Sequence, residues 1–156
     1  MEKTKRIAMI AHDNRKKDLI EWVEYNWEVL QDHQIICTGT TGSLVEKALF
    51  KNMNDKSSKK PEIKKLRSGP LGGDQQMGAL IAEGMIDIII FLWDPMQPQP
   101  HDVDVKALLR ISVLYNVPTA CNRSTADFMI SSPLFNEPYQ QLLKDYDEYI
   151  HRRLGD

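Results

Sequence analysis

The strongest constraint on the fold is an alternation, repeated five times along 156 residues, of a short apolar run with a longer segment of helical period. The apolar runs cover residues 6–11, 34–38, 63–67, 86–93 and 117–121. The run 86–93 is the most apolar, so we expect it at the centre of a sheet that is covered on both faces. Strands that alternate with helices pair in parallel through crossover connections. The sequence therefore predicts an α/β fold of three layers, α/β/α, with a five-stranded parallel sheet.

Helices are expected after each of these runs. The first shows one apolar face, formed by Leu19, Ile20, Val23, Trp27 and Leu30. The other helices are expected over 43–50, from Asp74 to a stop at Gly84, from an N-cap at Asp102 to about Val113, over 125–130, and over 140–154, where the pattern is amphipathic.

Length and composition describe one ordinary domain, residues 1–156, with 42% hydrophobic and 27% charged residues. The longest apolar run is too short to span a bilayer, and the N-terminus shows no signal peptide, so we expect no membrane partner. A net charge of −2 argues against nucleic acid as a partner. Two cysteines are too few for a disulfide scaffold, which favours a cytoplasmic protein. The lysine-rich segment 51–65 is interpreted as a solvated surface insertion.

Four of the expected strands end in polar or glycine-rich sequence. The first is followed by His12 and Asp13, the second by 38–42 (Thr-Gly-Thr-Thr-Gly), the third by 68–70 (Ser-Gly-Pro) and the fourth by Asp94. Ligands of doubly wound sheets bind beyond the carboxyl ends of the strands. Because four such ends meet at the same edge, we expect one site there.

Two of these ends have the character of phosphate sites. The turn 38–42 contains two glycines and three hydroxyls beside the start of a helix, where free N–H groups and a partial positive charge favour phosphate. Ser68 and Gly69 offer a second turn of the same kind, and Lys16 can add a cation. As isolated motifs they are weak, since threonine–glycine turns often only cap helices and a lysine on a helix is usually solvated.

The segment 72–76 (Gly-Gly-Asp-Gln-Gln) places a carboxylate at the start of a helix, where Asp74 is either a simple N-cap or a general base. His101 directly follows the proline-rich loop 94–100 and can polarise a carbonyl or shuttle a proton. Asp104 then faces either the site or solvent. His12, Asp13, Asp94, His101 and Asp104 also form a possible metal-ligand set, although none of them has dedicated metal-ligand spacing.

Other conspicuous residues have simpler interpretations. We expect His33 and His151 to be solvated, Trp22 and Trp27 to pack in the core or an interface, and Cys37 and Cys121 to be small apolar residues within strands. No arrangement of nucleophile and base for acyl transfer is visible. A Walker sequence and a Gly-x-Gly-x-x-Gly motif after the first strand are both absent, which disfavours a nucleotide-binding fold.

Taken together, the motifs resemble the methylglyoxal synthase family along essentially the whole chain. The segments that carry the resemblance are 11–13 (Ala-His-Asp), 38–42, 68–76, 91–95 (Phe-Leu-Trp-Asp-Pro), 101–110, and Asn122 with 125–128 (Thr-Ala-Asp-Phe). The block 72–76 is the most specific of them. Enzymes of this family convert dihydroxyacetone phosphate to methylglyoxal and inorganic phosphate.

The resemblance implies a role for each matching position. Asp74 matches the catalytic aspartate, the base that removes a proton from a substrate carbon. The substrate-binding positions are matched by His12, Lys16, Thr38, Gly39, Thr40, Thr41, Ser68, Gly69 and His101. Further acidic positions of the pocket are matched by Asp13, Asp94 and Asp104. The chain departs from the family in Val103, where members commonly carry proline, and in the longer, more basic connection between Phe50 and Ser68.

The resemblance also implies a five-stranded parallel sheet, no metal or organic cofactor, a homohexamer, and inhibition by inorganic phosphate. From the chemistry, we expect Asp74 to deprotonate the hydroxymethyl carbon and His101 to stabilise the enediolate, while 38–41, Ser68, Gly69 and Lys16 hold the phosphate. Two alternatives stay open: a non-catalytic domain of the same fold that senses a small anion, and a metal-assisted phosphohydrolase that uses the His and Asp residues.

Overall fold

The structure is a computed structural model that describes residues 1–51, 60–98 and 100–146. It contains one parallel sheet of five strands in the order β3-β2-β1-β4-β5. The strands are β1 (Arg6–Ala11), β2 (Gln34–Cys37), β3 (Ile63–Lys65), β4 (Ile88–Leu92) and β5 (Thr119–Ala120). The predicted fold class is confirmed, and the expected 86–93 strand is the five-residue β4, which is buried throughout and pairs with β1 and β5.

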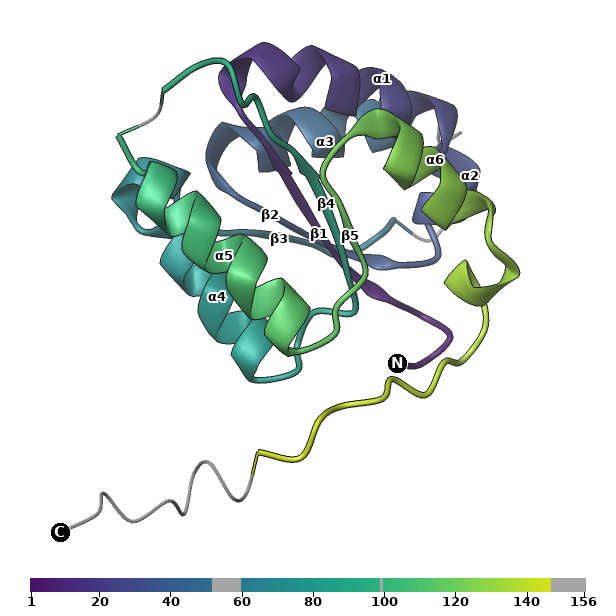
Figure 1. The fold of residues 1–156 in the computed structure, drawn as a ribbon. Helices are drawn as coiled ribbons and strands as arrows, with labels where there is room; N and C mark the ends of the chain where they lie inside the picture. Colours follow the sequence, from purple (N-terminus) through teal and green to yellow (C-terminus); the bar gives the residue numbers. More distant parts are fainter. Residues whose placement is uncertain (52–59, 99, 147–156) are drawn as a thin grey trace, which may run out of the picture.

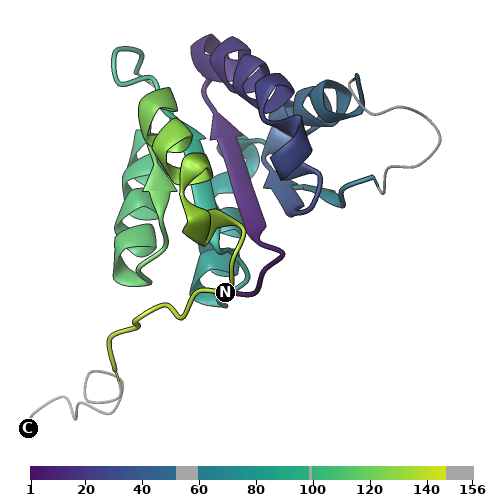
Figure 2. The same ribbon diagram turned by 90° about the vertical axis from the view of Figure 1, so that its right-hand side faces the viewer.

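Helices cover both faces of the sheet, which makes three layers (Figure 1). The helices are α1 (Lys16–Tyr25), α2 (Trp27–Leu30), α3 (Gly39–Lys51), α4 (Gly73–Ala82), α5 (Asp102–Leu114) and α6 (Arg123–Ser131), with 3₁₀ turns η1 (Asp13–Arg15), η2 (Gly69–Leu71) and η3 (Pro133–Phe135). Figures 1 and 2 show α4 and α5 on one face and α1, α3 and α6 on the other. Among the described residues, no helix has the length and apolar content that crossing a bilayer would require.

Alternation along the strands divides the buried side chains between two cores. In β1, Ile7 and Met9 pack into the core beneath α1, α3 and α6, while Ala8 and Ile10 pack into the core beneath α4 and α5. Successive side chains of a strand point to opposite faces, so a strand covered on both sides must be apolar at every position. This requirement explains why the sequence shows continuous apolar runs in place of alternating ones.

The strand order reverses direction between β1 and β4, which lie side by side at the middle of the sheet. From β1 the chain winds outward to β2 and β3, then crosses back to β4 and β5. The adjacent carboxyl ends at such a reversal leave a crevice, because their following loops run to opposite faces. His12 follows β1 and Asp94 follows β4, so the topology brings both to this crevice.

Three helices begin or break at other residues than the sequence indicated. The turn predicted at 39–42 is the first turn of α3, which begins at Gly39 directly after β2 and Thr38. The first helix is interrupted at Asn26, whose backbone N–H and side-chain Nδ2 both donate to the Trp22 carbonyl. The expected N-cap Asp102 is the first helical residue of α5, and His101 occupies the N-cap position.

The predicted final helix, 140–154, is wrong for its described part. Residues 140–146 are not helical, and 147–154 lie outside the described residues. Gln141 donates from Nε2 to the carbonyls of Tyr115 and Asn116, and the Asn116 side chain donates to the Leu142 carbonyl. These contacts hold the segment against the end of α5, and Figure 1 shows it leaving the α/β body. Most of the lysine-rich segment, residues 52–59, also lies outside the described residues.

The tryptophans and cysteines that the sequence assigned to packing mostly lie where we expected them. Trp22 is buried and donates from Nε1 to Asp127, and Trp27 packs against the same core. Burial raises the pKa of the Cys37 thiol to about 12, which makes this residue a packed apolar group. Cys121 is half-buried and follows β5, because that strand has only two residues. His151 lies outside the described residues.

His33 is the exception, because it is 4% exposed instead of solvated. Its Nδ1 accepts the Lys5 backbone N–H at 3.1 Å, and its Nε2 pairs with the Asn136 side chain at 3.1 Å. Phe135 contacts the ring edge-on. The chain segment that buries His33 is about a hundred residues away in sequence, so local sequence gave no signal of this burial.

We predict that His33 makes the protein less stable at mildly acidic pH. Burial lowers its pKa in the folded state below the ordinary value near 6.5. The unfolded chain therefore binds the proton more readily, so stability is full above about pH 6.5 and falls as the pH drops below it. Thermal melting between pH 7.5 and 5.5 should show this fall. His33→Gln should melt lower at pH 7.5 and lose part of the pH dependence; an unchanged dependence would exclude His33 as its source.

Candidate active site

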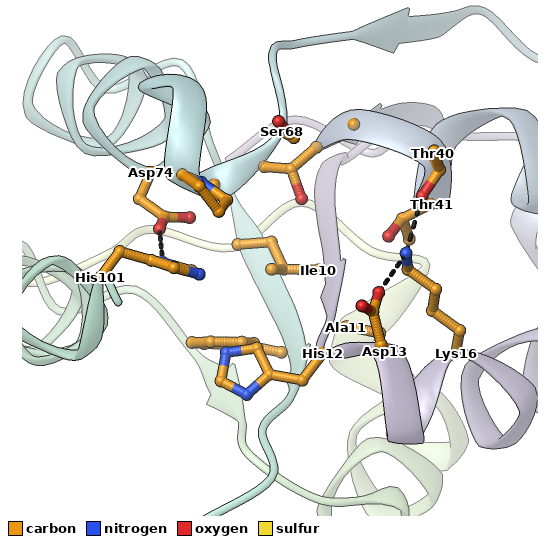
Figure 3. Close-up of a pocket in the computed structure, with 15 residues that line it drawn as sticks. Ile10, Ala11, His12, Asp13, Lys16, Thr40, Thr41, Ser68, Asp74 and His101 are labelled. Carbon is orange, nitrogen blue, oxygen red and sulfur yellow. Dashed lines mark hydrogen bonds and ion pairs between the residues drawn. The ribbon is translucent and has the colours of Figure 1, made fainter. Parts of the chain in front are cut away.

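The crevice at the carboxyl ends of β1 and β4 holds a pocket of about 110 Å³ (Figure 3). Its lining contains His12, Asp13, Lys16, Thr38, Gly39, Thr40, Thr41, Ser68, Gly69, Asp74 and His101 from the predicted set, together with Ile10, Ala11, Pro70 and Phe91. Every predicted substrate-binding residue therefore lines one pocket, as does the predicted base. Of the predicted acidic residues, Asp13 lines it, whereas Asp94 and Asp104 lie outside the lining.

One end of the pocket carries a cation and hydroxyls. Lys16, in the first turn of α1, reaches across to Thr40 in the first turn of α3, with 2.7 Å between Nζ and Oγ1. Its Nζ also lies 2.6 Å from the exposed Asp13 carboxylate, which lowers the pKa of Asp13 by hydrogen bonding. Thr38 and Thr41 are buried beside them. A fixed ammonium with several hydroxyls suits an anion such as a phosphate group.

The start of α3 adds backbone N–H groups to this end of the pocket. Fewer of them are available than in a free loop, because the Gly39 N–H is already bonded. The Gly39 N–H donates to the Arg67 carbonyl at 3.0 Å, which ties the helix start to the loop after β3. The amides that follow belong to the first helical turn, whose N–H groups have no acceptor within the helix. The positive end of the α3 dipole thus faces the pocket beside Lys16.

The opposite end is built around Asp74 and His101, which Figure 3 shows facing each other. Asp74 Oδ2 lies 2.7 Å from His101 Nδ1, and the two side chains are 4% and 12% exposed. Asp74 is the second residue of α4, whose N-cap is Gly72, so the carboxylate does not cap its own helix. With its Nδ1–H donated to Asp74, the ring holds the carboxylate in one orientation beside the pocket.

His12 supplies a buried donor to the same end. Its Nδ1 accepts the Asp94 backbone N–H at 3.3 Å, so in the neutral ring the proton is on Nε2. Burial lowers the pKa of His12, and the neighbouring His101 lowers it further, which favours this neutral form. Nε2 is buried and has no hydrogen-bond partner among the described residues. A buried donor without a partner is costly unless a ligand satisfies it.

Close packing explains the glycines beside Asp74. A Cβ on Gly73 would lie 2.1 Å from the Arg67 carbonyl oxygen, so the α4 start can approach the loop after β3 only without a side chain. Gly72 has a φ of +94°, a conformation that side-chain-bearing residues rarely adopt. The double glycine therefore brings the start of α4, and with it Asp74, against the pocket.

We predict that Gly69→Ala lowers activity without unfolding the protein. A Cβ there would lie 2.7 Å from His101 Cε1 and 2.9 Å from Asp74 Oδ2, so both side chains must shift. Displacing catalytic groups by about 1 Å costs on the order of 10²-fold in rate. Steady-state kinetics checks this loss. Gly78→Ala is the matched control, because among the described residues no atom outside its chain neighbours and the backbone of its own helix lies within 4 Å of the added Cβ; equal activity of both variants would contradict the prediction.

Asp94 holds the loop between β4 and α5 in place from outside the pocket lining. Its carboxylate accepts from Asn14 Nδ2 at 3.0 Å and from the Met96 backbone at 3.1 Å, and these bonds lower its pKa, the one from Asn14 most. Asn14 Nδ2 also lies 2.6 Å from Gln97 Oε1. The two contacts tether the loop that leads to His101.

Asp104 lies beside Asp74 and His101 on the first turn of α5. One side-chain ligand atom from each of these three residues lies within 4.8 Å of the others. Of the metal-ligand set considered from the sequence, the structure brings His101 and Asp104 together with Asp74. Asp13 lies at the other end of the pocket, beside Lys16.

Some contributors to the site have no signal in the sequence. Phe91 contacts the His12 ring edge-on, with 5.4 Å between centroids, but in sequence it is one of many apolar strand residues. Asn14 and Gln97 meet across 83 residues of chain. Gln76 accepts the Arg67 N–H and so fixes the loop after β3, a role that its place in the 72–76 block did not reveal.

Comparison with known proteins agrees with this arrangement. A family model described as an MGS-like domain matches residues 18–121. A methylglyoxal synthase of Maridesulfovibrio salexigens is 55% identical, with 99% of this chain and 100% of that protein covered. The chain belongs to the methylglyoxal synthase family.

Further members of the methylglyoxal synthase family show the same extent of similarity. The methylglyoxal synthase of Leptospira interrogans is 56% identical, with 95% of this chain and 93% of that protein covered. The crystal structure of methylglyoxal synthase from Elizabethkingia anophelis NUHP1 superposes with a TM-score of 0.87 at 47% identity, covering 100% of this chain and 96% of that one. These findings confirm the family, the fold and the enzyme class predicted from the sequence, a lyase that acts on a phosphate ester.

Proposed function

We propose that the chain converts dihydroxyacetone phosphate to methylglyoxal and inorganic phosphate, with Asp74 as the general base. Family membership supports the reaction. The roles of the residues are assigned from one observation: the pocket has two ends of different chemistry. Lys16 and hydroxyls of α3 form an anion-binding end, and Asp74, His101 and His12 form an end suited to proton transfer.

At the anion-binding end, the substrate phosphate is held by Lys16, the hydroxyls of Thr38, Thr40 and Thr41, and the loop of Ser68 and Gly69. Lys16 already contacts Thr40, so its ammonium is fixed before the substrate arrives. The α3 dipole adds a favourable field for the dianion. Free inorganic phosphate should occupy the same end, which is why we propose it as an inhibitor as well as a product.

At the other end, Asp74 takes a proton from the hydroxymethyl carbon of the substrate. The electron pair left on carbon forms a double bond to the carbonyl carbon. The carbonyl oxygen takes the negative charge, which gives an enediolate. Such an anion is unstable in water, so a donor must meet the developing charge. The Nε2–H of His12, which no group of the described residues accepts, can donate to this oxygen, and His101, which holds Asp74, is the second candidate donor.

Loss of phosphate completes the reaction. The hydroxyl proton on the deprotonated carbon passes to the former carbonyl oxygen, and that hydroxyl becomes the aldehyde carbonyl. The double-bond pair of the enediolate then shifts to form a new carbon–carbon double bond to the phosphate-bearing carbon, as the carbon–oxygen bond to phosphate breaks and its electrons leave with the phosphate. This step requires the breaking bond to stand out of the enediolate plane, because only then does it overlap the π system. By fixing the phosphate, the α3 turn and Lys16 also fix this torsion. The released enol then becomes methylglyoxal by proton transfer to carbon.

The remaining acidic residues have separate proposed tasks. Asp13 orients the Lys16 ammonium, and Asp94 holds His12 and the loop before α5. Asp104, beside Asp74 and His101, shares in the proton transfers of that end. All steps use side chains of the chain, and we propose that the reaction needs no metal or organic cofactor.

The setting of the enzyme is proposed from the resemblance. We expect a single domain over residues 1–156 that assembles into a homohexamer in the cytoplasm, where the reaction bypasses part of glycolysis. We propose no nucleic-acid or membrane partner. Sedimentation of the purified protein would test the hexamer independently of activity.

The reaction is tested by incubating chelator-treated protein with dihydroxyacetone phosphate and measuring methylglyoxal and inorganic phosphate together. Equal release of both, above the spontaneous rate, is the expected result. Added inorganic phosphate should inhibit in competition with the substrate. Phosphate release without methylglyoxal would indicate a phosphohydrolase. Tight phosphate binding without turnover would indicate an anion-sensing domain and overturn the proposal.

A further inference from the structure

The two ends of the pocket belong to different helices, so their relative position depends on the loop that lies between them. Thr40 is in the first turn of α3, and Asp74 is in the first turn of α4. The loop 66–72 leads from β3 to α4, and Figure 3 shows its Ser68 between Thr40 on one side and Asp74 on the other. A shift of this loop would therefore move the anion-binding end relative to the base.

A single peptide group of this loop contacts both helices. The Leu66 carbonyl accepts the Gly39 N–H at the start of α3, at 3.3 Å. The N–H of the same peptide, which belongs to Arg67, donates to Gln76 Oε1 of α4 at 2.9 Å. Because the carbonyl and the N–H of a trans peptide point in opposite directions, this peptide spans the gap between the two helices. The Arg67 carbonyl reinforces the contact with α3, since it accepts the same Gly39 N–H at 3.0 Å.

Gln76 contributes the one side chain of this link among the described residues. The other hydrogen bonds that join the loop to α3 and α4 are made by backbone groups, such as that from the Gly73 N–H to the Ser68 carbonyl at 2.9 Å. Gln76 is exposed, two residues after Asp74, so its replacement leaves the core beneath α4 intact. The link can therefore be weakened at this residue without unfolding the protein.

We propose that Gln76 is a positioning residue that holds the two ends of the pocket in register, so that the enediolate loses phosphate instead of being reprotonated. This inference rests on the proposed function. Phosphate leaves only when its carbon–oxygen bond stands out of the enediolate plane, which requires the phosphate and the enediolate to be held in one mutual orientation. Lys16 and Thr40 hold the first group and Asp74 the second, so the loop between them sets that orientation.

A looser link would favour the competing fate of the enediolate. When the carbon–oxygen bond turns toward the plane, the enediolate persists and takes a proton back from Asp74. Return of the proton to the hydroxymethyl carbon regenerates dihydroxyacetone phosphate. Return to the former carbonyl carbon, with transfer of the hydroxyl proton to its oxygen, gives the isomer glyceraldehyde 3-phosphate. In D₂O the acid proton of Asp74 exchanges with solvent, so both returns leave deuterium on a carbon of a triose phosphate.

The test measures turnover of dihydroxyacetone phosphate in D₂O by NMR. Gln76→Met keeps the length of the side chain and removes the amide acceptor. We expect its kcat to fall about tenfold, and its ratio of deuterated triose phosphate to methylglyoxal to rise at least about fivefold. Gln76→Glu retains an Oε acceptor and should stay within about threefold of the unmodified enzyme in both quantities.

The matched control is Gln75→Met, in the same turn of α4. Gln75 is also exposed, and among the described residues its side chain takes no part in the hydrogen bonds of the loop, so kcat and the ratio should not change. Hydrogen exchange, measured by mass spectrometry on the peptide that contains Arg67, tests the contact without turnover. Exchange of the Arg67 N–H should be faster in Gln76→Met than in Gln76→Glu or Gln75→Met, and thermal melting shows that each variant is folded.

A lower kcat of Gln76→Met with an unchanged ratio would overturn the proposal, because it would indicate a structural effect alone. So would equal impairment of Gln76→Glu, or unchanged kcat, ratio and Arg67 exchange in Gln76→Met. If the unmodified protein formed no methylglyoxal, the proposed function would fall and this inference with it. Normal turnover by the unmodified protein, combined with an unchanged ratio in Gln76→Met, would overturn the positioning role only.

Discussion

Asp74→Asn is expected to lower kcat by about 10²- to 10⁴-fold while inorganic phosphate binds almost as before. Asparagine has nearly the shape of aspartate and can keep a hydrogen bond to His101, but it cannot accept the substrate proton. The phosphate-binding end of the pocket, with Lys16 and Thr40, has no contact with residue 74 among the hydrogen bonds of the site. Steady-state kinetics with dihydroxyacetone phosphate, together with phosphate binding, measures both halves of the expectation.

The control for this variant is Asp18→Asn, which removes an exposed carboxylate of α1 that pairs with Arg15 on the surface. Its kcat should equal that of the unmodified protein. Binding of inorganic phosphate by Asp74→Asn is the second control, because it shows that the pocket of this variant is formed. If Asp74→Asn bound phosphate and kept its kcat, another group would be the base, and Asp104 would be the first to test.

The fold was predictable because its determinants are local. A parallel strand covered on both faces must be apolar at each position, and this requirement is visible in the run 88–92 without any knowledge of its neighbours. Alternation with helical segments then fixes the direction of the strands, and the direction places their carboxyl ends on one edge. The gathering of His12, Thr38, Ser68 and Asp74 around one pocket follows from these two steps.

Features that depend on distant partners were predicted wrongly or not at all. Residues 39–42 have low helical propensity, yet α3 begins at Gly39 because the Arg67 carbonyl holds that residue. The segment after Gln140 has an amphipathic pattern, but contacts with Tyr115 and Asn116 hold its described part in a non-helical conformation. Hydrogen bonds between residues that are far apart in sequence leave no periodic signal, so the loop tether of Asn14 was also missed.

The two nitrogens of His12 have different surroundings, and this difference gives the second prediction. Nδ1 accepts the Asp94 N–H, while Nε2 is buried and has no hydrogen-bond partner in the part of the chain that the structure describes. The side-chain oxygen of asparagine can take the place of Nδ1, and the side-chain nitrogen of glutamine can take the place of Nε2. His12→Asn thus keeps the support of the loop and removes the donor, whereas His12→Gln keeps a donor in the pocket.

We expect His12→Asn to lower kcat by about 10²- to 10³-fold, the usual cost of losing one donor to a developing oxyanion. His12→Gln should stay within about tenfold of the unmodified enzyme, because an amide N–H still reaches the enediolate oxygen. KM should change little in either variant, since the donor acts on charge that appears only in the transition state. The reverse order, with Asn active and Gln impaired, would mean that His12 acts through the Asp94 loop. Because the same two variants remove different ring nitrogens, their kinetics separate catalysis by Nε2 from positioning by Nδ1.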